Sequence, residues 1–429
     1  MAETSPTNRP VVSPPVEGAA VRSTRLLSLD ALRGFDMYWI MGGDALGSAV
    51  SAIVGHPAPA EAGQEPSRTI GQVIADQLEH VEWAGFHFED LIFPLFVFMA
   101  GVSQVFSLTR LREKEGTTAA LGRLLRRTLL LYIIGIFYYG GFSGTFEHIR
   151  LLGVLQRIAL ASGGAGALFL LFRTRSLIGI TAGILLGYWA LVALTPVRDI
   201  SLEKAAIKAQ IAAHPGSTAQ SLYDSTTQTV VGSFEEGKNV VNHFDFKYLP
   251  WRKWDGHFDP EGILSTFPAV ASGLLGILAG IYLNSPNSSP GQKAMGLIGV
   301  GVVLLAAGWG WHSVFPVIKK IWSSSFVLVA GGWSAILLGT FYWIIDVRGW
   351  KAWCAPFVWV GTNSIAVYLA GAIIDFEKLG SRFVGGEIAK YLDRTIAPGT
   401  GTFVLALSGL ALVLVLARFL YRRQIFIRV

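Results

Sequence analysis

The chain has 429 residues, of which 52% are hydrophobic and only 15% are charged, and its mean hydropathy is +0.48. Soluble domains usually contain about a quarter charged residues, so this composition excludes an ordinary soluble protein and indicates an integral membrane protein. The formal net charge of +6 is explained by basic loops on the cytoplasmic side of a membrane, and no nucleic-acid partner is expected.

The chain divides into a short polar segment and a long apolar one. Residues 1–24 are polar, contain proline and lack the apolar core of a signal peptide, which predicts a disordered cytoplasmic tail. Residues 25–429 contain ten apolar stretches long enough to cross a bilayer, for which about 20 residues are needed. These stretches are approximately 31–54, 88–109, 124–142, 151–172, 176–195, 262–284, 293–312, 324–346, 354–375 and 400–421. The sequence therefore predicts an all-α polytopic membrane protein, a bundle of about ten transmembrane helices with a long external loop region.

The basic residues predict how this bundle is oriented. Lysine and arginine gather in 110–127 and in other loops on the same side, and cytoplasmic loops carry such an excess. Both termini are therefore predicted to be cytoplasmic, in a bacterial inner membrane. Lys319 and Lys320 are an exception on the external side. The polar stretch 196–261 is also external, is too small for a core of its own, and is predicted to be a lid or vestibule.

The first span carries charged side chains, which are costly inside a bilayer and usually face a cavity or a partner. These are Asp30, Arg33, Asp36 and Asp44. We expect Arg33 and Asp30 to form a structural pair, and Asp36 to reach the cytoplasmic surface. Asp44 follows Gly42 and Gly43, which allow another backbone or a ligand to approach closely, so a functional cavity is favoured there.

Polar residues also occur in the fourth and sixth spans. Gln156 and Arg157 lie one to two turns from the external end of the fourth span. Two roles for Arg157 are open: a pair with Asp90 that joins two helices, or a clamp on an anionic or carbonyl group of a ligand. Asp259 before Pro260 is predicted to be a helix cap, whereas Glu261 is less easily explained as one.

The ninth span contains one cysteine and two polar side chains. Cys354 is the only cysteine of the chain, which excludes an intrachain disulfide. It is predicted to be a packing residue, because an acyl-carrying thiol needs a nearby base and no histidine lies on its side of the membrane. Asn363 and Ser364 are either interhelical contacts or ligand-binding groups.

The stretch HVEWAGFHFEDLIFPLFVFMAG, from His80 to Gly101, concentrates polar residues at the start of an apolar helix. An interfacial anchor with aromatic residues and Asp90 as a helix cap is one explanation. A functional site is the other.

Five blocks decide between these explanations by their order. They are SLDALRGFDM, HVEWAGFHFEDLIFPLFVFMAGVS, GVLQRIA, FDPEGILSTFPAVASGLLGILAG and WVGTNSIAVY. In this order they resemble the heparan-α-glucosaminide N-acetyltransferase family of transmembrane acetyltransferases. The resemblance covers residues 25–429, and the luminal domain that precedes the bundle in the lysosomal member has no counterpart in this sequence.

The resemblance implies transfer of an acetyl group from cytoplasmic acetyl-CoA to the amino group of a glucosamine-type sugar on the external face. The family's active histidine corresponds to His80, in a turn with Trp83 and Gly85 and followed by Asp90. Where the lysosomal enzyme has an asparagine in its first span, this chain has Asp44, so the acceptor and the proton transfers of the reaction remain open.

The chemistry assigns roles to the polar residues. His80 is a general base or an acetyl carrier, oriented or charged by Asp44 or Asp90. Arginines at the cytoplasmic mouth would bind the phosphates of acetyl-CoA, and other polar groups would bind the acceptor or stabilise the oxyanion. The predicted acetyl-CoA-binding residues are Arg33, Arg126 and Arg127, and the predicted acceptor-binding residues are Trp83, Gln156, Arg157, Glu261, Asn363 and Ser364.

Other function classes use some of the same residues. A sugar or ion transporter would use Asp44, Arg157 and Glu261, although the chain has no internal repeat of the kind seen in many transporters. An O-acetyltransferase that acts on a polysaccharide or a lipid would share the architecture. A metal receptor with His80, His87 and Asp90 is disfavoured for lack of ligand spacing, and no metal is predicted. The sequence does not identify the acceptor sugar, and it does not decide whether the chain forms a homodimer.

Overall fold

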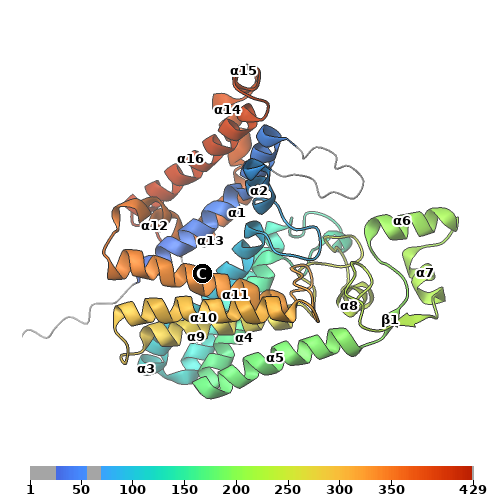
Figure 1. Cartoon of the computed structure of the whole chain (residues 1–429), viewed down its shortest axis with the longest axis horizontal. Helices are drawn as coiled ribbons and strands as arrows, with labels where there is room; N and C mark the ends of the chain where they lie inside the picture. Colours follow the sequence, from blue (N-terminus) through green and yellow to red (C-terminus); the bar gives the residue numbers. More distant parts are fainter. Residues whose placement is uncertain (1–25, 56–68, 428–429) are drawn as a thin grey trace, which may run out of the picture.

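The computed structural model describes residues 26–55 and 69–427, so the predicted tail at 1–24 lies outside the described residues. The described chain is almost entirely helical (Figure 1). Eight helices are long and apolar enough to cross a membrane, because their sequences hold few charges over at least five turns. They are α1 (Leu27–Val54), α3 (Phe88–Tyr138), α4 (Val154–Leu171), α5 (Thr174–Leu194), α9 (Thr266–Asn284), α10 (Pro290–Trp311), α11 (Ser324–Tyr342, continued by the π-helical turn η2, Trp343–Val347) and α16 (Thr400–Arg422). The prediction of an all-α polytopic membrane protein is confirmed.

A ninth candidate span is broken in its middle. It consists of η3 (Ala352–Cys354), α12 (Ala355–Gly361) and α13 (Ser364–Ile373), which meet at an angle of 64°. Cys354 is buried at its start, in agreement with the predicted packing role. Asn363 precedes α13 and lies at the break.

The 51-residue α3 is a helical hairpin, with Gly116 at its turn (φ 86°, ψ 170°). The left-handed φ of Gly116 interrupts the helix and is favourable only for glycine. Gln104 and Leu124 lie on opposite sides of this turn, and both pack against Gly166 of α4. In a straight helix they would be about 30 Å apart. The hairpin therefore supplies two spans, which brings the structure into agreement with the ten predicted ones.

Close helix packing in the bundle depends on small residues at the crossings. The hairpin α3 packs against α4 and α9, α10 packs along α11, and α1 lies against α12 and α16. At the α3–α9 crossing, a methyl group on Gly276 would lie 1.9 Å from the carbonyl oxygen of Phe98, so only glycine fits there. This contact fixes how α3 is placed, and α3 begins at the candidate site.

Short elements surround the bundle. They are α2 (Ile70–Gln77), η1 (Phe146–His148), β1 (Val197–Arg198), α6 (Lys204–Ala213), α7 (Ala219–Ser225), β2 (Thr229–Val230), α8 (Val240–Tyr248), α14 (Phe376–Val384) and α15 (Glu387–Thr395). The strands β1 and β2 pair antiparallel, with Val197 opposite Val230. The predicted helix near 201–213 is α6. Val240 and Val241 of α8 join Tyr188 of α5 and Phe315 in one buried cluster, so 196–261 packs on the bundle rather than forming its own core.

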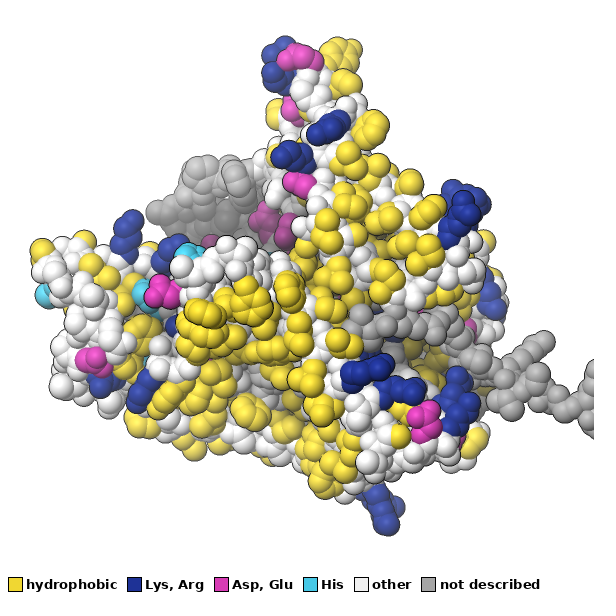
Figure 2. All heavy atoms as spheres, turned by 180° about the vertical axis from the view of Figure 1, so that it is seen from behind, with side chains coloured by type: hydrophobic (Ala, Val, Ile, Leu, Met, Phe, Trp, Pro, Cys, Tyr) yellow, Lys and Arg dark blue, Asp and Glu magenta, His cyan; other side chains and the backbone are white. Residues whose placement is uncertain are grey.

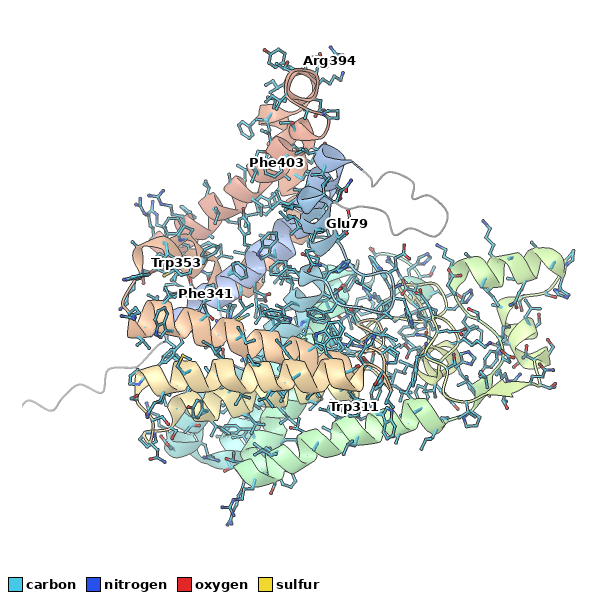
Figure 3. All side chains as sticks on the ribbon, viewed as in Figure 1. Glu79, Trp311, Phe341, Trp353, Arg394 and Phe403 are labelled. Carbon is cyan, nitrogen blue, oxygen red and sulfur yellow. The ribbon has the colours of Figure 1, made fainter. Side chains whose placement is uncertain are left out.

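The two ends of the bundle differ in their histidines. Figure 2 shows a broad apolar surface with Lys and Arg side chains on both sides of it, whereas the histidines visible in this view lie on one side only. Tryptophans mark both ends, with Trp311 at one end and Trp353 at the other (Figure 3), as expected near headgroups. We call the end that contains Arg110 and Arg127 the basic end, and the end that contains His80 the histidine end. Leu26 and Ile427, the outermost described residues, both lie at the basic end.

Candidate active site

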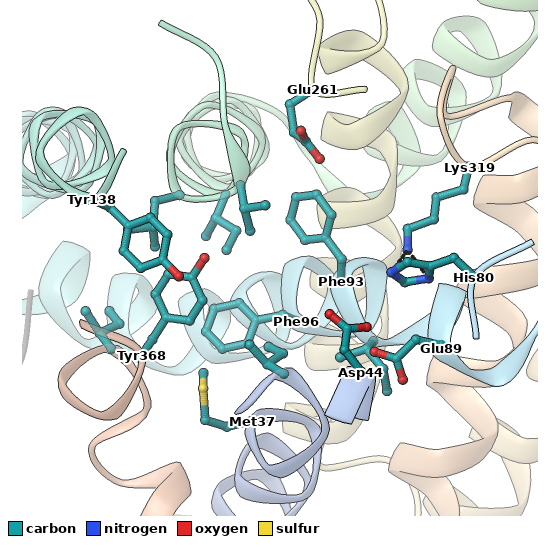
Figure 4. A pocket seen from close by; sticks show the side chains of 16 residues that line it. Met37, Asp44, His80, Glu89, Phe93, Phe96, Tyr138, Glu261, Lys319 and Tyr368 are labelled. Atoms are coloured by element: carbon teal, nitrogen blue, oxygen red, sulfur yellow. Dashed lines mark hydrogen bonds between the residues drawn. The ribbon is translucent and has the colours of Figure 1, made fainter. Parts of the chain in front are cut away.

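A cavity of about 300 Å³ opens at the histidine end. Its polar lining comes from five side chains on separate parts of the chain, Asp44, His80, Glu89, Glu261 and Lys319, as Figure 4 shows. The rest of its wall is largely apolar and aromatic, including Phe93, Phe96, Tyr138 and Tyr368. We call it the histidine cavity. Of the predicted site residues, Asp44, His80 and Glu261 are brought together here.

Asp90 holds the turn that carries His80. As the third residue of α3, its Oδ2 accepts hydrogen bonds from the backbone N–H of His87 (3.0 Å) and of Val81 (3.3 Å). Its Oδ1 lies 3.1 Å from Nδ1 of His80. Asp90 is only 1% exposed, so this local cap also fixes the imidazole. The predicted helix-cap role of Asp90 is confirmed, whereas its role in orienting His80 for catalysis stays a prediction that this contact fits.

Lys319 is a residue of the cavity that the sequence did not assign to the site. The backbone N–H of Gly85 donates to the carbonyl of Val317 (2.8 Å), and Ala84 forms an isolated bridge with Ile318. This pairing places the Nζ of Lys319 3.0 Å from Nδ1 of His80 and 3.3 Å from Oδ1 of Asp90. One feature of the sequence could have pointed to it: Lys319 lies on the predicted external side, where few lysines and arginines are expected.

Asp90 and Lys319 both lie within hydrogen-bond distance of Nδ1 of His80, but Asp90 needs a donor there and the ammonium of Lys319 needs an acceptor. An imidazole nitrogen either carries a proton and donates it or has a lone pair and accepts. If Nδ1–H donates to Asp90, Nε2 has the free lone pair of a base. If the ammonium of Lys319 donates to Nδ1, the proton of a neutral ring is on Nε2. The two side chains together therefore control which nitrogen of His80 can accept a proton.

Two carboxylates face each other across the α1–α3 contact. A Cβ on Gly43 would lie 2.8 Å from Oε2 of Glu89, so the absence of a side chain at this glycine makes room for the carboxylate. Glu89 is 6% exposed, and its Oε2 has no hydrogen-bond partner in the described part of the chain. Asp44 is exposed to the cavity. The two glycines are closely approached by side chains, Leu410 at Gly42 and Glu89 at Gly43, rather than by the predicted backbone or ligand. Glu89 is a cavity residue that sequence reasoning left unassigned.

Glu261 belongs to a buried charged cluster. Arg150 donates from Nε to Oδ2 of Asp259 (2.9 Å) and from Nη2 to Oδ1 of Asp259 (2.7 Å) and Oε2 of Glu261 (2.5 Å). Its guanidinium lies between the rings of Tyr139 and Trp254, at 4.5 and 4.8 Å. Burial, followed by the charge of Asp259, raises the pKa of Glu261 to about 6. Arg150 was not singled out from the sequence, because nothing local marks its partners.

The helix-cap interpretation of Asp259 is wrong. The helix α9 begins at Thr266 with Ser265 as its cap residue, whereas Pro260 lies in the loop before it. Asp259 instead accepts from Arg150 and from the backbone N–H of Glu261 (3.0 Å). A buried guanidinium is a stronger partner for this carboxylate than a helix N-terminus.

Arg157 and Gln156 lie outside the histidine cavity. Arg157 is 1% exposed, donates to Ser265 and to the carbonyl of Gly262 (3.3 Å), and stacks 4.9 Å from the ring of Trp322. It forms no pair with Asp90, so that alternative is wrong. Gln156 donates to the carbonyl of Arg150 (3.2 Å) and is fully buried. Of the three residues of the transporter alternative, Asp44 and Glu261 line the histidine cavity and Arg157 does not.

Trp83 also points away from the cavity. Its indole N–H donates to the carbonyl of Phe234 (2.7 Å). It therefore ties the turn of His80 to the region 196–261, and of this region only Glu261 is among the residues that line the cavity.

A second cavity, of about 520 Å³, lies at the basic end. Arg33, Arg110 and Arg127 line it together with Ser103 and Ser364, and we call it the basic cavity. Arg33 donates to Ser103 (2.5 Å) and lies 3.6 Å from Asp30, as predicted for that pair. Two of the three predicted acetyl-CoA-binding arginines are therefore in this cavity.

Three further predictions are resolved at this end. Arg126 is exposed and does not line the basic cavity. Asn363 is buried and accepts from the backbone N–H of Ile427 (3.1 Å). Asp36 is completely buried rather than at the surface, because its side of α1 faces the other helices, so that prediction is wrong.

The two cavities share part of their walls. Phe96, Leu155, Ile158 and Ile365 line both of them. The two cavities therefore adjoin at this apolar layer.

No family model matches the chain. It is 26% identical over 340 residues to heparan-alpha-glucosaminide N-acetyltransferase of Homo sapiens, a match that covers 69% of this chain and 49% of the human protein. The Mus musculus protein of the same name is 25% identical over 339 residues, with the same coverage. The chain spans about half the length of the curated relatives that it matches. These similarities confirm the family resemblance predicted from the five ordered blocks.

Proposed function

We propose that this chain is a transmembrane acetyltransferase that moves an acetyl group from acetyl-CoA in the basic cavity to the amino group of a glucosamine-type sugar in the histidine cavity. The observation that carries the proposal is the shared wall of Phe96, Leu155 and Ile158. It brings a site suited to a phosphorylated thioester next to a site that contains a base. In this proposal the basic end faces the cytoplasm, as the distribution of Lys and Arg favours.

The residues of the basic cavity fit acetyl-CoA. Arg33, Arg110 and Arg127 can bind its phosphates through charge-assisted hydrogen bonds. The apolar layer with Phe96 and Ile365 offers a path for the uncharged arm toward the histidine cavity. The thioester would then lie near His80, while the nucleotide stays at the basic end.

The residues of the histidine cavity can then perform the transfer. The acceptor ammonium gives a proton to Nε2 of His80, the amine nitrogen bonds to the thioester carbonyl carbon, and the carbon–sulfur bond breaks. The leaving thiolate takes the second proton of the amine nitrogen and departs as CoA thiol, and the imidazolium of His80 then releases its proton to water. Asp90 accepts from Nδ1–H of His80 and stabilises the imidazolium formed on the way, and Lys319 is the nearest cation for the oxyanion.

A two-step route uses the same residues in another order. Nε2 of His80 attacks the thioester carbonyl carbon, CoA leaves, and the acetyl-imidazole is then attacked by the amine. Rapid-quench mass spectrometry of protein mixed with acetyl-CoA and no acceptor separates the routes. An acetylated His80 supports two steps, and its absence supports direct transfer.

The decisive test is His80→Ala in the purified protein, with glucosamine as acceptor and acetyl-CoA as donor. Transfer should fall to the uncatalysed rate while the protein stays folded and keeps its acetyl-CoA affinity. His87→Ala is the matched control, because Nδ1 of His87 is hydrogen-bonded to the carbonyl of Glu79 (2.9 Å) and His87 is not among the residues that line the cavity. Turnover retained in His80→Ala would defeat both routes. A parallel acceptor screen that includes N-acetylglucosamine and glucosamine-terminated oligosaccharides tests O-acetylation and acceptor length.

A further inference from the structure

Three side chains of the histidine cavity lie close together in a way that acetyl transfer does not require. Asp44, His80 and Glu89 each place one potential metal-ligand atom within 4.8 Å of the others. They come from α1, from the turn before α3, and from α3 itself. This set differs from the one considered in the sequence, since His87 and Asp90 have other partners.

The charges around this set are only partly balanced by the protein, because Lys319 is the one cation among the described residues that line the cavity and its Nζ lies 3.0 Å from Nδ1 of His80. Asp90 is matched by the ammonium of Lys319 at 3.3 Å and by two backbone N–H groups. Neither Asp44 nor Glu89 forms an ion pair with a lysine or arginine in residues 26–55 and 69–427. Glu89 is moreover a buried carboxylate with an unpartnered oxygen, and such a group is stabilised when it is paired, takes up a proton or coordinates a metal. A cation bound between Asp44 and Glu89 would supply the missing partner.

We propose that Asp44, His80 and Glu89 form a binding site for a divalent transition-metal ion of the zinc type. One imidazole nitrogen and two carboxylate oxygens are ligands that Zn²⁺ accepts at about 2.0–2.2 Å, with a fourth position open to water. Mg²⁺ and Ca²⁺ are disfavoured, because they require six or more oxygen ligands. Glu89 is fixed against Gly43, whereas Asp44 and the half-exposed His80 face the cavity and can adjust to complete the site.

Metal binding has a direct consequence for the ring of His80. A nitrogen that coordinates a metal has no lone pair left to accept a proton or attack a carbonyl. The bound ion therefore blocks acetyl transfer, and this consequence rests on the proposed function. Binding itself does not, so the two can fail separately.

The test begins with the wild-type protein, stripped of metal with a chelator and dialysed. Zn²⁺ titration by calorimetry should give one site per chain, and Co²⁺ should give the visible absorption of a low-coordinate nitrogen–oxygen site. Zn²⁺ should also protect His80, and not His87, from carbethoxylation by diethyl pyrocarbonate, read by mass spectrometry. These measurements need no variant and no catalytic activity. No binding, or binding without protection of His80, overturns the proposal.

Variants then identify the ligands. Glu89→Gln and Asp44→Asn should each weaken Zn²⁺ binding at least tenfold, while the control Glu82→Gln should bind as the wild type does. Glu82 is an exposed acidic residue of the same turn that does not line the cavity. Equal affinity in all three variants would show an adventitious ion only and would overturn the site. If Zn²⁺ binds as described but acetyl transfer is not inhibited, the role of His80 in the proposed function fails instead.

Discussion

The side chain of Lys319 reaches His80 across 239 residues of sequence, with Nζ 3.0 Å from Nδ1. Because the same ammonium also lies 3.3 Å from the buried Asp90, it links the two residues that the local turn already joins. We therefore expect Lys319 to be needed for the geometry and charge of the site rather than for binding acetyl-CoA.

Replacing Lys319 tests this relationship. Lys319→Met should lower kcat at least tenfold, because Asp90 loses its cationic partner and the oxyanion loses the nearest cation, while KM for acetyl-CoA stays unchanged. Lys319→Arg should recover part of the rate. Lys320→Met is the control, since Lys320 pairs with Glu236 (2.7 Å) and does not contact His80. Equal rates in the wild type and Lys319→Met would contradict the assignment.

A methyl group at Gly43 should disturb the carboxylate of Glu89. The added Cβ would meet both oxygens of that carboxylate within 3 Å, so Gly43→Ala should displace Glu89 and cost about 1–3 kcal/mol of stability, as overpacking usually does. It should also weaken Zn²⁺ binding. Gly122→Ala, also within α3 but with no atom within 4 Å of the added group, should keep or slightly raise the melting temperature and leave Zn²⁺ affinity unchanged. Wild-type Zn²⁺ affinity in Gly43→Ala would argue against Glu89 as a ligand.

The neighbouring arginines of the hairpin should differ in their effect on acetyl-CoA. Arg127 lines the basic cavity and Arg126 is exposed outside it. Arg127→Gln should raise KM for acetyl-CoA about tenfold or more, the loss expected for one charge-assisted hydrogen bond. Arg126→Gln should change KM less than twofold. Initial-rate kinetics with varied acetyl-CoA measure both, and equal effects would place the phosphates elsewhere.

Loss of Arg150 should destabilise the protein. Arg150→Gln leaves the buried carboxylates of Asp259 and Glu261 without their cation, and breaking such a buried pair costs about 3–5 kcal/mol. Arg123→Gln removes an exposed pair with Glu115 (3.4 Å), which should cost about 0–1 kcal/mol. Thermal unfolding in detergent compares the two variants. A melting temperature of Arg150→Gln equal to that of Arg123→Gln would mean that the cluster is not a stabilising unit.

The carboxyl group of Asp245 should make stability depend on pH. Burial raises its pKa to about 7, so the folded protein holds this proton more tightly than the unfolded chain does. Its stabilising contribution is therefore complete below pH ~4 and is lost as the pH rises to about 7, at up to about 1.4 kcal/mol per pH unit. Asp245→Asn should flatten the change in melting temperature between pH 5 and pH 8, relative to the wild type. An unchanged slope would assign the dependence to another group.

The sequence by itself determined what depends on neighbouring residues. Hydropathy over about 20 residues identifies a span, so the ten spans and their even number followed from composition along the chain. The turn of His80 and the capping role of Asp90 followed as well, because they lie ten residues apart and share one helix start. The separation of an arginine-rich end from a histidine end followed too, because successive loops alternate between the two ends of a helical bundle.

Only the tertiary structure decided which distant side chains meet. Lys319 reaches His80 through a backbone pairing between two loops, and Arg150 finds Asp259 across 109 residues. The rotation of each helix about its axis buried Asp36 and turned Arg157 toward Ser265 instead of Asp90. Such rotations are set by close contacts such as that of Gly276 with Phe98. These contacts depend on the shapes of two helices at once, so a pattern read along one helix cannot contain them.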